Sequence, residues 1–292
     1  MVTTADRTRP ALQRWGRGRT AEAHHVLRRL GISDTAALAA LAVVFVVALL
    51  APLLAPHSTS VPAGEAFLAP GGGHLLGTDE VGRDILSRVL EGIRSSWLSA
   101  LLVIASGVVV GGLVGVVAGA VGGWVDSLLM RLTDAFLALP GPLLAICVVA
   151  ALGPSLTHTL LAVMIVWWPF YARIVRGEVR AQAARPHVEA ARLSGVGPVR
   201  IALKHLLPGA LVSTLVAASL DMGNLIITLA ALSFLGLGAP APAPELGGMA
   251  ARGMSNLLEH WWVPVMPGVA VLLLALVANL AGDALRNLLA DR

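Results

Sequence analysis

The side chains with the clearest chemistry gather in residues 173–209, a polar stretch between two apolar runs. Seven of the chain's 21 Lys and Arg residues lie there. Pro186 and Pro198 each suit a first helical turn, where a missing N–H costs nothing. Gly195 and Gly197 permit a sharp turn and a left-handed backbone. We therefore predict two short helices joined by a turn, a basic element suited to docking rather than to catalysis.

Two alanines, Ala190 and Ala191, follow Glu189 in the first of these predicted helices. Their short side chains keep one helix face thin, so that another surface can approach it closely. Pro208 is expected to end the segment where the next apolar run begins.

Residues that nucleotide or metal chemistry would require are missing from the sequence. Lys204 is the only lysine and lies in no G-x-x-x-x-G-K-[ST] loop, so the chain lacks the phosphate-binding loop of an ATPase. Cys147 is the single cysteine, which excludes an intrachain disulfide and a cysteine metal site. The sequence has no H-E-x-x-H or G-x-S-x-G motif and no cluster of His, Cys or Asp. We expect a non-enzymatic chain that binds no cofactor or metal of its own.

Composition places this chain in a membrane. Apolar residues make up 57% of it and charged residues 13%, with a mean hydropathy of +0.80. Such values are typical of an all-α polytopic membrane protein. The net charge of +4 comes from arginines beside apolar runs, which orient a membrane protein, so no nucleic-acid partner is expected.

Six apolar runs are expected to cross the bilayer, since about 20 helical residues cover about 30 Å. Residues 1–34 precede them as a basic, partly disordered tail with a short surface helix at 24–30. Pro140 and Pro142 are expected to kink the third run. The predicted spans are residues 36–55, 97–122, 127–152, 157–172, 209–235 and 264–281.

A separate helix is predicted from Thr78, before the second span. Thr78 can cap it, with Asp79 and Glu80 favourable in its first turn. Apolar residues recur every four positions, with charged residues on the opposite face. We predict an amphipathic helix on the membrane surface, either an elbow into the next span or a place that receives a substrate-delivering partner. The apolar residues are Val81, Ile85, Val89 and Ile93.

Four glycines of the second span, Gly107, Gly111, Gly115 and Gly119, are spaced four residues apart and so line one helix face. In lipid, such a face allows two helices to approach to backbone contact. We predict that another span packs against it.

The distribution of positive charge predicts the orientation. With six spans and a cytoplasmic N-terminus, 17 Lys and Arg residues fall on one side of the membrane and four on the other. Positive charge concentrates on the cytoplasmic side. We therefore place both termini and residues 173–209 in the cytoplasm, and residues 56–77 outside it.

Residues 173–209 resemble the EAA loop of ABC importer permeases, in which E-A-A is followed by a glycine and later by L-P. Further stretches are similar to the dipeptide, oligopeptide and nickel uptake branch of these permeases, in particular to its second permease subunit. The resemblance covers roughly residues 74–290. The similar stretches are GTDEVGRDILSRVLEG (77–92), GGWVDSLLMRLTDAFLALPG (122–141), YARIVRGEV (171–179), LSFLGLG (232–238) and NLAGDALR (279–286).

The resemblance implies a type I ABC importer permease fold. Residues 35–73 would form the first transmembrane helix and an extracytoplasmic loop, and residues 74–292 the permease core. The implied partners are a homologous second permease, two ABC ATPase subunits that hold ATP and Mg²⁺, an extracytoplasmic substrate-binding protein and the lipid of a bacterial cytoplasmic membrane. The transporter would import peptides by alternating access. Nickel complexes, glutathione or another small solute are alternatives, and a secondary transporter is a distant one.

By the same resemblance, the helix that begins near Pro186 is a coupling helix seated in a groove of an ATPase. Glu189 is expected to fix the loop through hydrogen bonds or an ion pair with an arginine such as Arg192, a solvated helix charge being the alternative. A bulky residue in place of Gly195, or a reversed charge at Glu189, should uncouple transport. The coupling positions are Pro186, Val188, Glu189, Ala190, Ala191, Gly195, Leu207 and Pro208.

A few polar residues inside the predicted spans are candidates for the translocation path. A carboxyl at the depth of Asp221 is costly unless it faces water or a partner, so it either lines the path or pairs with another span or with the second subunit. Asn224 and Thr228 follow it on the same run. Asp134, three residues after Arg131, is expected to pair with that arginine, a gate lining being the alternative.

Overall fold

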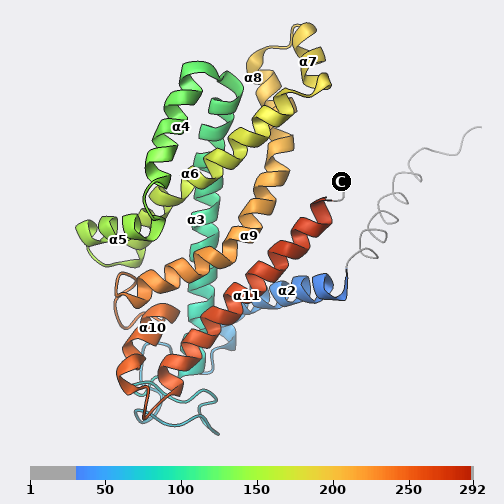
Figure 1. Cartoon of the computed structure of the whole chain (residues 1–292). Coiled ribbons are helices and arrows are strands. Elements are labelled where there is room, and N and C mark those ends of the chain that lie inside the picture. The colour runs from blue at the N-terminus through green and yellow to red at the C-terminus, as the bar shows by residue number, and fades with distance from the viewer. Residues whose placement is uncertain (1–30, 291–292) are drawn as a thin grey trace, which may run out of the picture.

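The computed structural model describes residues 31–290, and its regular elements are helices. The all-α prediction is confirmed. The predicted surface helix at 24–30, with most of the basic tail, lies outside the described residues. In Figure 1 the short helices α7 (Pro186–Leu193) and α8 (Pro198–Ile201) project at one end of the long helices, and loops gather at the other end.

Within residues 31–290, five helices are long and apolar enough to cross a membrane, and one bent helix pair supplies a sixth candidate. The six predicted spans therefore each correspond to a helix or to this pair. The single helices are α2 (Ile32–Leu54), α3 (Ile85–Val121), α6 (Leu156–Ala183), α11 (Trp262–Ala290) and the continuous stretch Pro198–Phe234, which contains α9 (Leu207–Phe234).

The bent pair consists of α4 (Gly123–Leu137) and α5 (Gly141–Leu152), whose axes differ by 81°. Pro140 precedes α5, and a second proline lies in its first turn. A proline removes a backbone N–H and excludes the helical backbone from the residue before it. The predicted kink in the third span is thus a break between two helices.

The prediction of a separate helix from Thr78 is wrong. Helix α3 begins only at Ile85 and continues without a break as the second span. Asp84 caps it by accepting a hydrogen bond from the Ser87 N–H at 2.8 Å. Burial raises the pKa of the Asp84 carboxyl, but hydrogen bonds, chiefly from Ser87, outweigh it, and the pKa lies below its usual value. Gly82 has a φ of +84°, which a helix cannot contain. The residues before Ile85 therefore form a folded loop.

The charged residues of that region are buried instead of facing solvent. Arg83 is 5% exposed and Arg88 is 1% exposed. The Arg83 Nε atom lies 2.7 Å from Asp79 Oδ2, and Arg88 Nε lies 3.5 Å from the same oxygen. Arg88 also donates to the carbonyls of Thr59 and Pro242, at 2.5 and 3.1 Å. It thereby joins the loop before α3 to the loop that leads into α10 (Leu246–Gly253).

Two further boundaries differ from prediction. α6 continues past Ala172, the predicted end of the fourth span, to Ala183. Pro208 does not end the polar segment, because it lies in the first turn of α9. A five-residue π-helical turn, η1 (Ala202–Leu206), precedes it. The wider turn accommodates a residue without an N–H and lets the helix continue into the membrane.

The glycine stripe of α3 packs against α6, as predicted. A Cβ atom on Gly115 would lie 2.6 Å from the Ala172 carbonyl oxygen, and one on Gly107 would lie 2.8 Å from the Tyr171 ring. Tyr171 itself is fully buried. The two backbones are therefore in direct contact, which couples α3 and α6 rigidly.

Candidate functional site

The predicted pair of short helices exists as α7 (Pro186–Leu193) and α8 (Pro198–Ile201), and a proline lies in the first turn of each. We call residues 186–201 the hairpin. Gly195 has a φ of +75°, and the Val196 N–H donates to the Ala191 carbonyl at 3.1 Å. A left-handed glycine with this bond is a standard helix C-terminus, so the turn is specified by local sequence.

A small apolar core fixes the hairpin to the long helices. Val188 of α7 is fully buried and Ile201 of α8 is 5% exposed. Both pack against residues of α6, η1 and α9, so the hairpin is anchored to those helices. The other buried members are Val175, Val179, Leu206 and Ala210, with Val116, Ala183 and Val196 packed against them.

The outward side of the hairpin is exposed. Glu189, Ala190 and Arg192 face solvent, and Leu193 is 85% exposed. The predicted bond between Glu189 and Arg192 is not formed, since the Glu189 carboxylate has no ion pair within residues 31–290. The solvated-charge alternative fits this geometry. The outward side of α7 therefore combines an exposed leucine with charged side chains that form no ion pair within residues 31–290.

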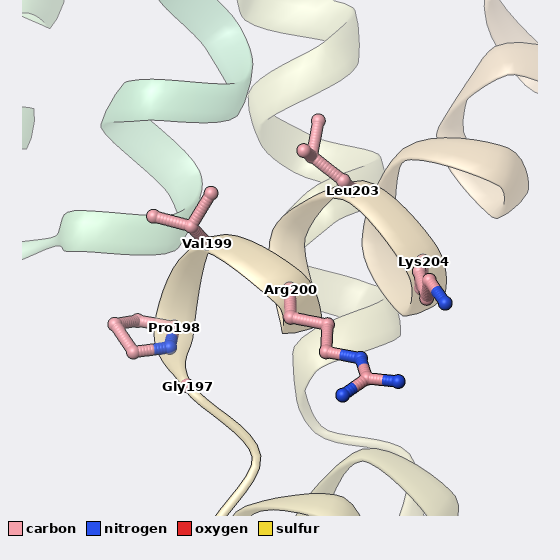
Figure 2. Close-up of a pocket in the computed structure, with 6 residues that line it drawn as sticks. All are labelled: Gly197, Pro198, Val199, Arg200, Leu203 and Lys204. Carbon is pink, nitrogen blue, oxygen red and sulfur yellow. The ribbon is translucent and has the colours of Figure 1, made fainter.

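A shallow cavity of about 570 Å³ lies on the α8 arm of the hairpin and on η1. Figure 2 shows that Val199 and Leu203 point to one side of this helix, whereas Arg200 and Lys204 point away from them. Val199 is 71% exposed. The surface next to α7 therefore combines an apolar ridge with two cations, and it extends the exposed face of the hairpin.

An ion cluster that the sequence analysis missed joins α4 to α6 near the hairpin. Asp126, 5% exposed, accepts from Arg176 Nη2 at 2.8 Å and from Arg180 Nη2 at 2.5 Å. Asp134 pairs with Arg173 at 2.6 Å, and not with Arg131 as predicted. The signal was present in the spacing of residues 173, 176 and 180, which share one face once α6 is known to continue. The predicted end of the fourth span, at Ala172, falls before all three arginines.

Asp221 of α9 is bound by α6. Its Oδ2 atom accepts from Trp167 Nε1 at 2.5 Å and from the Tyr171 hydroxyl at 3.1 Å. Asn224 donates to the other carboxylate oxygen at 3.3 Å. Asp221 is therefore paired with another span, α6, which is one of the two predicted alternatives. Thr228, the fourth candidate, is buried and donates back to a backbone carbonyl of α9.

The predicted coupling positions do not all lie together. Those from 186 to 191 are on α7, and Gly195 is in the turn. Leu207 and Pro208 lie beyond the hairpin at the start of α9. There Leu207 lines an apolar cavity of about 290 Å³ between α3, α6 and α9.

Residues 111–292 match the sequence profile of the family described as "Binding-protein-dependent transport system inner membrane component". The Probable D,D-dipeptide transport system permease protein DdpC of Escherichia coli (strain K12) is 41% identical over 239 residues, which are 82% of this chain and 80% of the relative. The Di/tripeptide transport system permease protein DppC of Pseudomonas aeruginosa is 41% identical, covering 83% and 82%. The Glutathione transport system permease protein GsiD of Pectobacterium atrosepticum is 40% identical, covering 75% and 73%.

The fold is also similar to that of a chain in the inward-facing MetNI methionine ABC transporter. The TM-score is 0.58 at 21% identity, over 70% of this chain and 97% of that one. At such identity the likeness concerns the fold alone. It confirms the predicted type I importer architecture.

Proposed function

Because this chain belongs to the family of binding-protein-dependent transport system inner membrane components, we propose that it forms half of a peptide pathway across a bacterial cytoplasmic membrane. A permease of this kind implies an ATPase and an extracytoplasmic binding protein as partners. The second half of the pathway would be a homologous permease. ATP and Mg²⁺ would remain on the ATPase subunits, two per transporter.

The observation that carries this proposal is the hairpin. It presents an exposed face with Glu189, Ala190 and Leu193, while Val188 on the opposite face is fully buried. A rigid element that is anchored on one side and free on the other can transmit a force. We assign the exposed face to the ATPase and the buried face to the transmission of its movement.

The route of transmission follows the contacts of the hairpin core. When the ATPase subunits close, α7 would move, and Val188 would carry α6 and α9 with it. The glycine stripe would pass the motion to α3, and the Asp126 ion cluster would pass it to α4. The helices would then alternate between inward- and outward-facing arrangements.

The orientation of the chain follows from its charge. With 17 Lys and Arg residues on the hairpin side and four on the other, the positive-inside rule supports a cytoplasmic hairpin and cytoplasmic termini. The loops around Arg88 and α10 would then face the binding protein. Asp134, Asp221, Asn224 and Thr228 stay candidates for the path, and the bonds of Asp221 to α6 favour a positioning role for it.

Peptides are the proposed substrates because two of the relatives described above are named for dipeptide or tripeptide transport. Glutathione, itself a tripeptide derivative, is the second candidate, since a relative at 40% identity is named for it.

The test is uptake by the whole transporter, with both permeases, the ATPases and the binding protein in proteoliposomes. We expect a labelled dipeptide to enter only with ATP, and an excess of unlabelled tripeptide to compete. Stronger competition by glutathione than by peptides would favour the second candidate. Uptake by this chain without any ATPase would contradict the proposal.

A further inference from the structure

The 55–84 loop lies at the end of the molecule opposite the hairpin (Figure 1). Two histidines and an aspartate from distant parts of this loop come close together. One ligand atom from each of His57, His74 and Asp84 lies within 4.8 Å of the other two. The His74 Nδ1 atom is 2.9 Å from Asp84 Oδ1, and His57 Nδ1 is 3.8 Å from Asp84 Oδ2. The sequence pattern does not predict this cluster, because 16 residues separate His57 from His74 and nine separate His74 from Asp84.

The cluster contains a polar atom that lacks a partner. Asp84 is 1% exposed, and the His57 Nδ1 atom is buried with no hydrogen-bond partner among the described residues. Leaving a buried nitrogen unpaired is unfavourable, and such an atom calls for an explanation. A cation bound to the neighbouring carboxylate would satisfy this nitrogen if it also accepted the lone pair of the imidazole.

The surrounding hydrogen bonds hold the cluster in place. Ser87 donates to Asp84 Oδ2 from both its N–H and its hydroxyl, at 2.8 and 2.6 Å. The same hydroxyl accepts a hydrogen bond from the backbone N–H of His57 at 3.1 Å. These bonds leave Asp84 Oδ1 directed at His74. Outer contacts of this type orient the ligands of protein metal sites.

We infer that His57, His74 and Asp84 bind a divalent transition-metal ion, of which Zn²⁺ fits best. Two imidazoles and one carboxylate are suitable ligands for zinc. They do not suit Ca²⁺ or Mg²⁺, which prefer oxygen ligands. Ligand atoms around tetrahedral zinc lie about 3.3 Å apart for bonds of about 2.0–2.1 Å. His74 Nδ1 and Asp84 Oδ1, 2.9 Å apart, lie close to that spacing, and one ligand atom from each of the three residues lies within 4.8 Å of the others, so a small movement of the loop would close the set around an ion. The ion replaces the hydrogen bond between His74 Nδ1 and Asp84 Oδ1, and water completes its fourth position.

The consequence is a clamp on the loop before α3. The ion ties residue 57 near the start of the loop and residue 74 in its middle to Asp84, the cap of α3. Its role is structural, because a bound ion stabilises only the folded loop. This inference does not depend on which solute the transporter carries.

The test measures zinc on the full-length chain, purified with its partner subunits by a tag without histidines. After chelator treatment, one arm receives Zn²⁺ alone and is desalted, and metal is counted by inductively coupled plasma mass spectrometry. We expect about one Zn²⁺ per chain and at least a tenfold weaker affinity in His57→Gln and Asp84→Asn, by competition with a chelating dye. Asn caps a helix as well as Asp does, so Asp84→Asn keeps the start of α3.

The matched control is His260→Gln. His260 also has a buried Nδ1 without a partner among the described residues, and it stacks on Phe67 at 4.2 Å, but it lies outside the cluster. It should keep the zinc of the wild type. Zinc should also raise the midpoint of thermal unfolding of the wild type and of His260→Gln only. A wild-type chain without zinc, or equal zinc in His57→Gln, would overturn the inference, whatever the outcome of the uptake assay.

Discussion

At the hairpin, the charged groups of Glu189 and Arg192 are exposed, whereas at the opposite end Arg83 and Arg88 are almost completely buried. The two buried arginines bind Asp79, and Arg88 also binds loop carbonyls. Glu189 and Arg192 form no ion pair within residues 31–290. Charged side chains therefore hold the loops together at one end, whereas the charged side chains of the hairpin itself are exposed to solvent. We interpret the first end as a fixed cap and the second as a surface for a partner.

The largest effect is expected at the cap, from Arg88→Ala. The change leaves the Thr59 and Pro242 carbonyls and part of the Asp79 carboxylate without a donor in a buried setting. Breaking a buried pair in this way costs about 3–5 kcal/mol of unfolding free energy. Thermal unfolding of the purified chain in detergent measures it. The control is Arg94→Ala, whose partly exposed pair with Glu91 should contribute no more than about 0.5 kcal/mol. Equal effects would remove the distinction between cap and surface charges.

The next effect concerns the contact that links the two ends, the packing of α3 on α6. Gly111→Ala places a Cβ atom against the backbone at Trp168 and Ala172, so we expect a loss of about 1–3 kcal/mol. At Gly112 a Cβ atom meets nothing within 4 Å, and Gly112→Ala should gain up to about 1 kcal/mol from helix propensity. Unfolding midpoints that shift in the same direction would show that the glycine face does not determine this packing.

A smaller effect on stability, with a large one on transport, is expected at the turn of the hairpin. Gly195→Ala puts a side chain at a φ of +75°, at a cost of about 1–2 kcal/mol. Because this turn sets the direction of α7, ATP-dependent uptake should fall severalfold while the complex still assembles. Gly197, whose φ is −65°, offers a matched control, and Gly197→Ala should transport normally. Loss of uptake in both variants would mean that the left-handed turn is not what matters.

The smallest effect is expected for Asp221→Asn. The asparagine oxygen can still accept from Trp167 and Tyr171, so only the extra strength of bonds to a charge is lost, about 1 kcal/mol. Uptake rate and substrate range should change little, whereas Asp221→Leu, which cannot accept either bond, should impair the chain. A changed substrate range in Asp221→Asn would instead place this carboxylate in the path.

Features encoded by local rules could be predicted from the sequence. The prolines and Gly195 specify the hairpin, and the four-residue glycine spacing specifies the α3–α6 contact. Hydrophobic length alone located all six candidate spans. In each case the relevant partners are close in sequence or repeat with a helical period.

Features that depend on tertiary contacts could not be predicted in this way. The periodicity after Thr78 suggested a surface helix with solvated charges, but Gly82 interrupts it and Arg88 is bound by carbonyls from two separate loops. The pairing of Asp134 with Arg173 needed the extension of α6 beyond Ala172. The His57, His74 and Asp84 cluster needed the path of a loop without regular structure.

The central claim, that the hairpin is held by an ATPase inside the cell, is tested most directly by the accessibility of Ala190. In a Cys147→Ser background, Ala190→Cys is compared with Ser60→Cys at the other end, both at exposed positions. A membrane-impermeant thiol reagent should label only Ser60→Cys in intact cells. In inverted vesicles it should label Ala190→Cys, and added ATPase subunits should block that labelling. Labelling of Ala190→Cys from outside, or its indifference to the ATPase, would contradict the account.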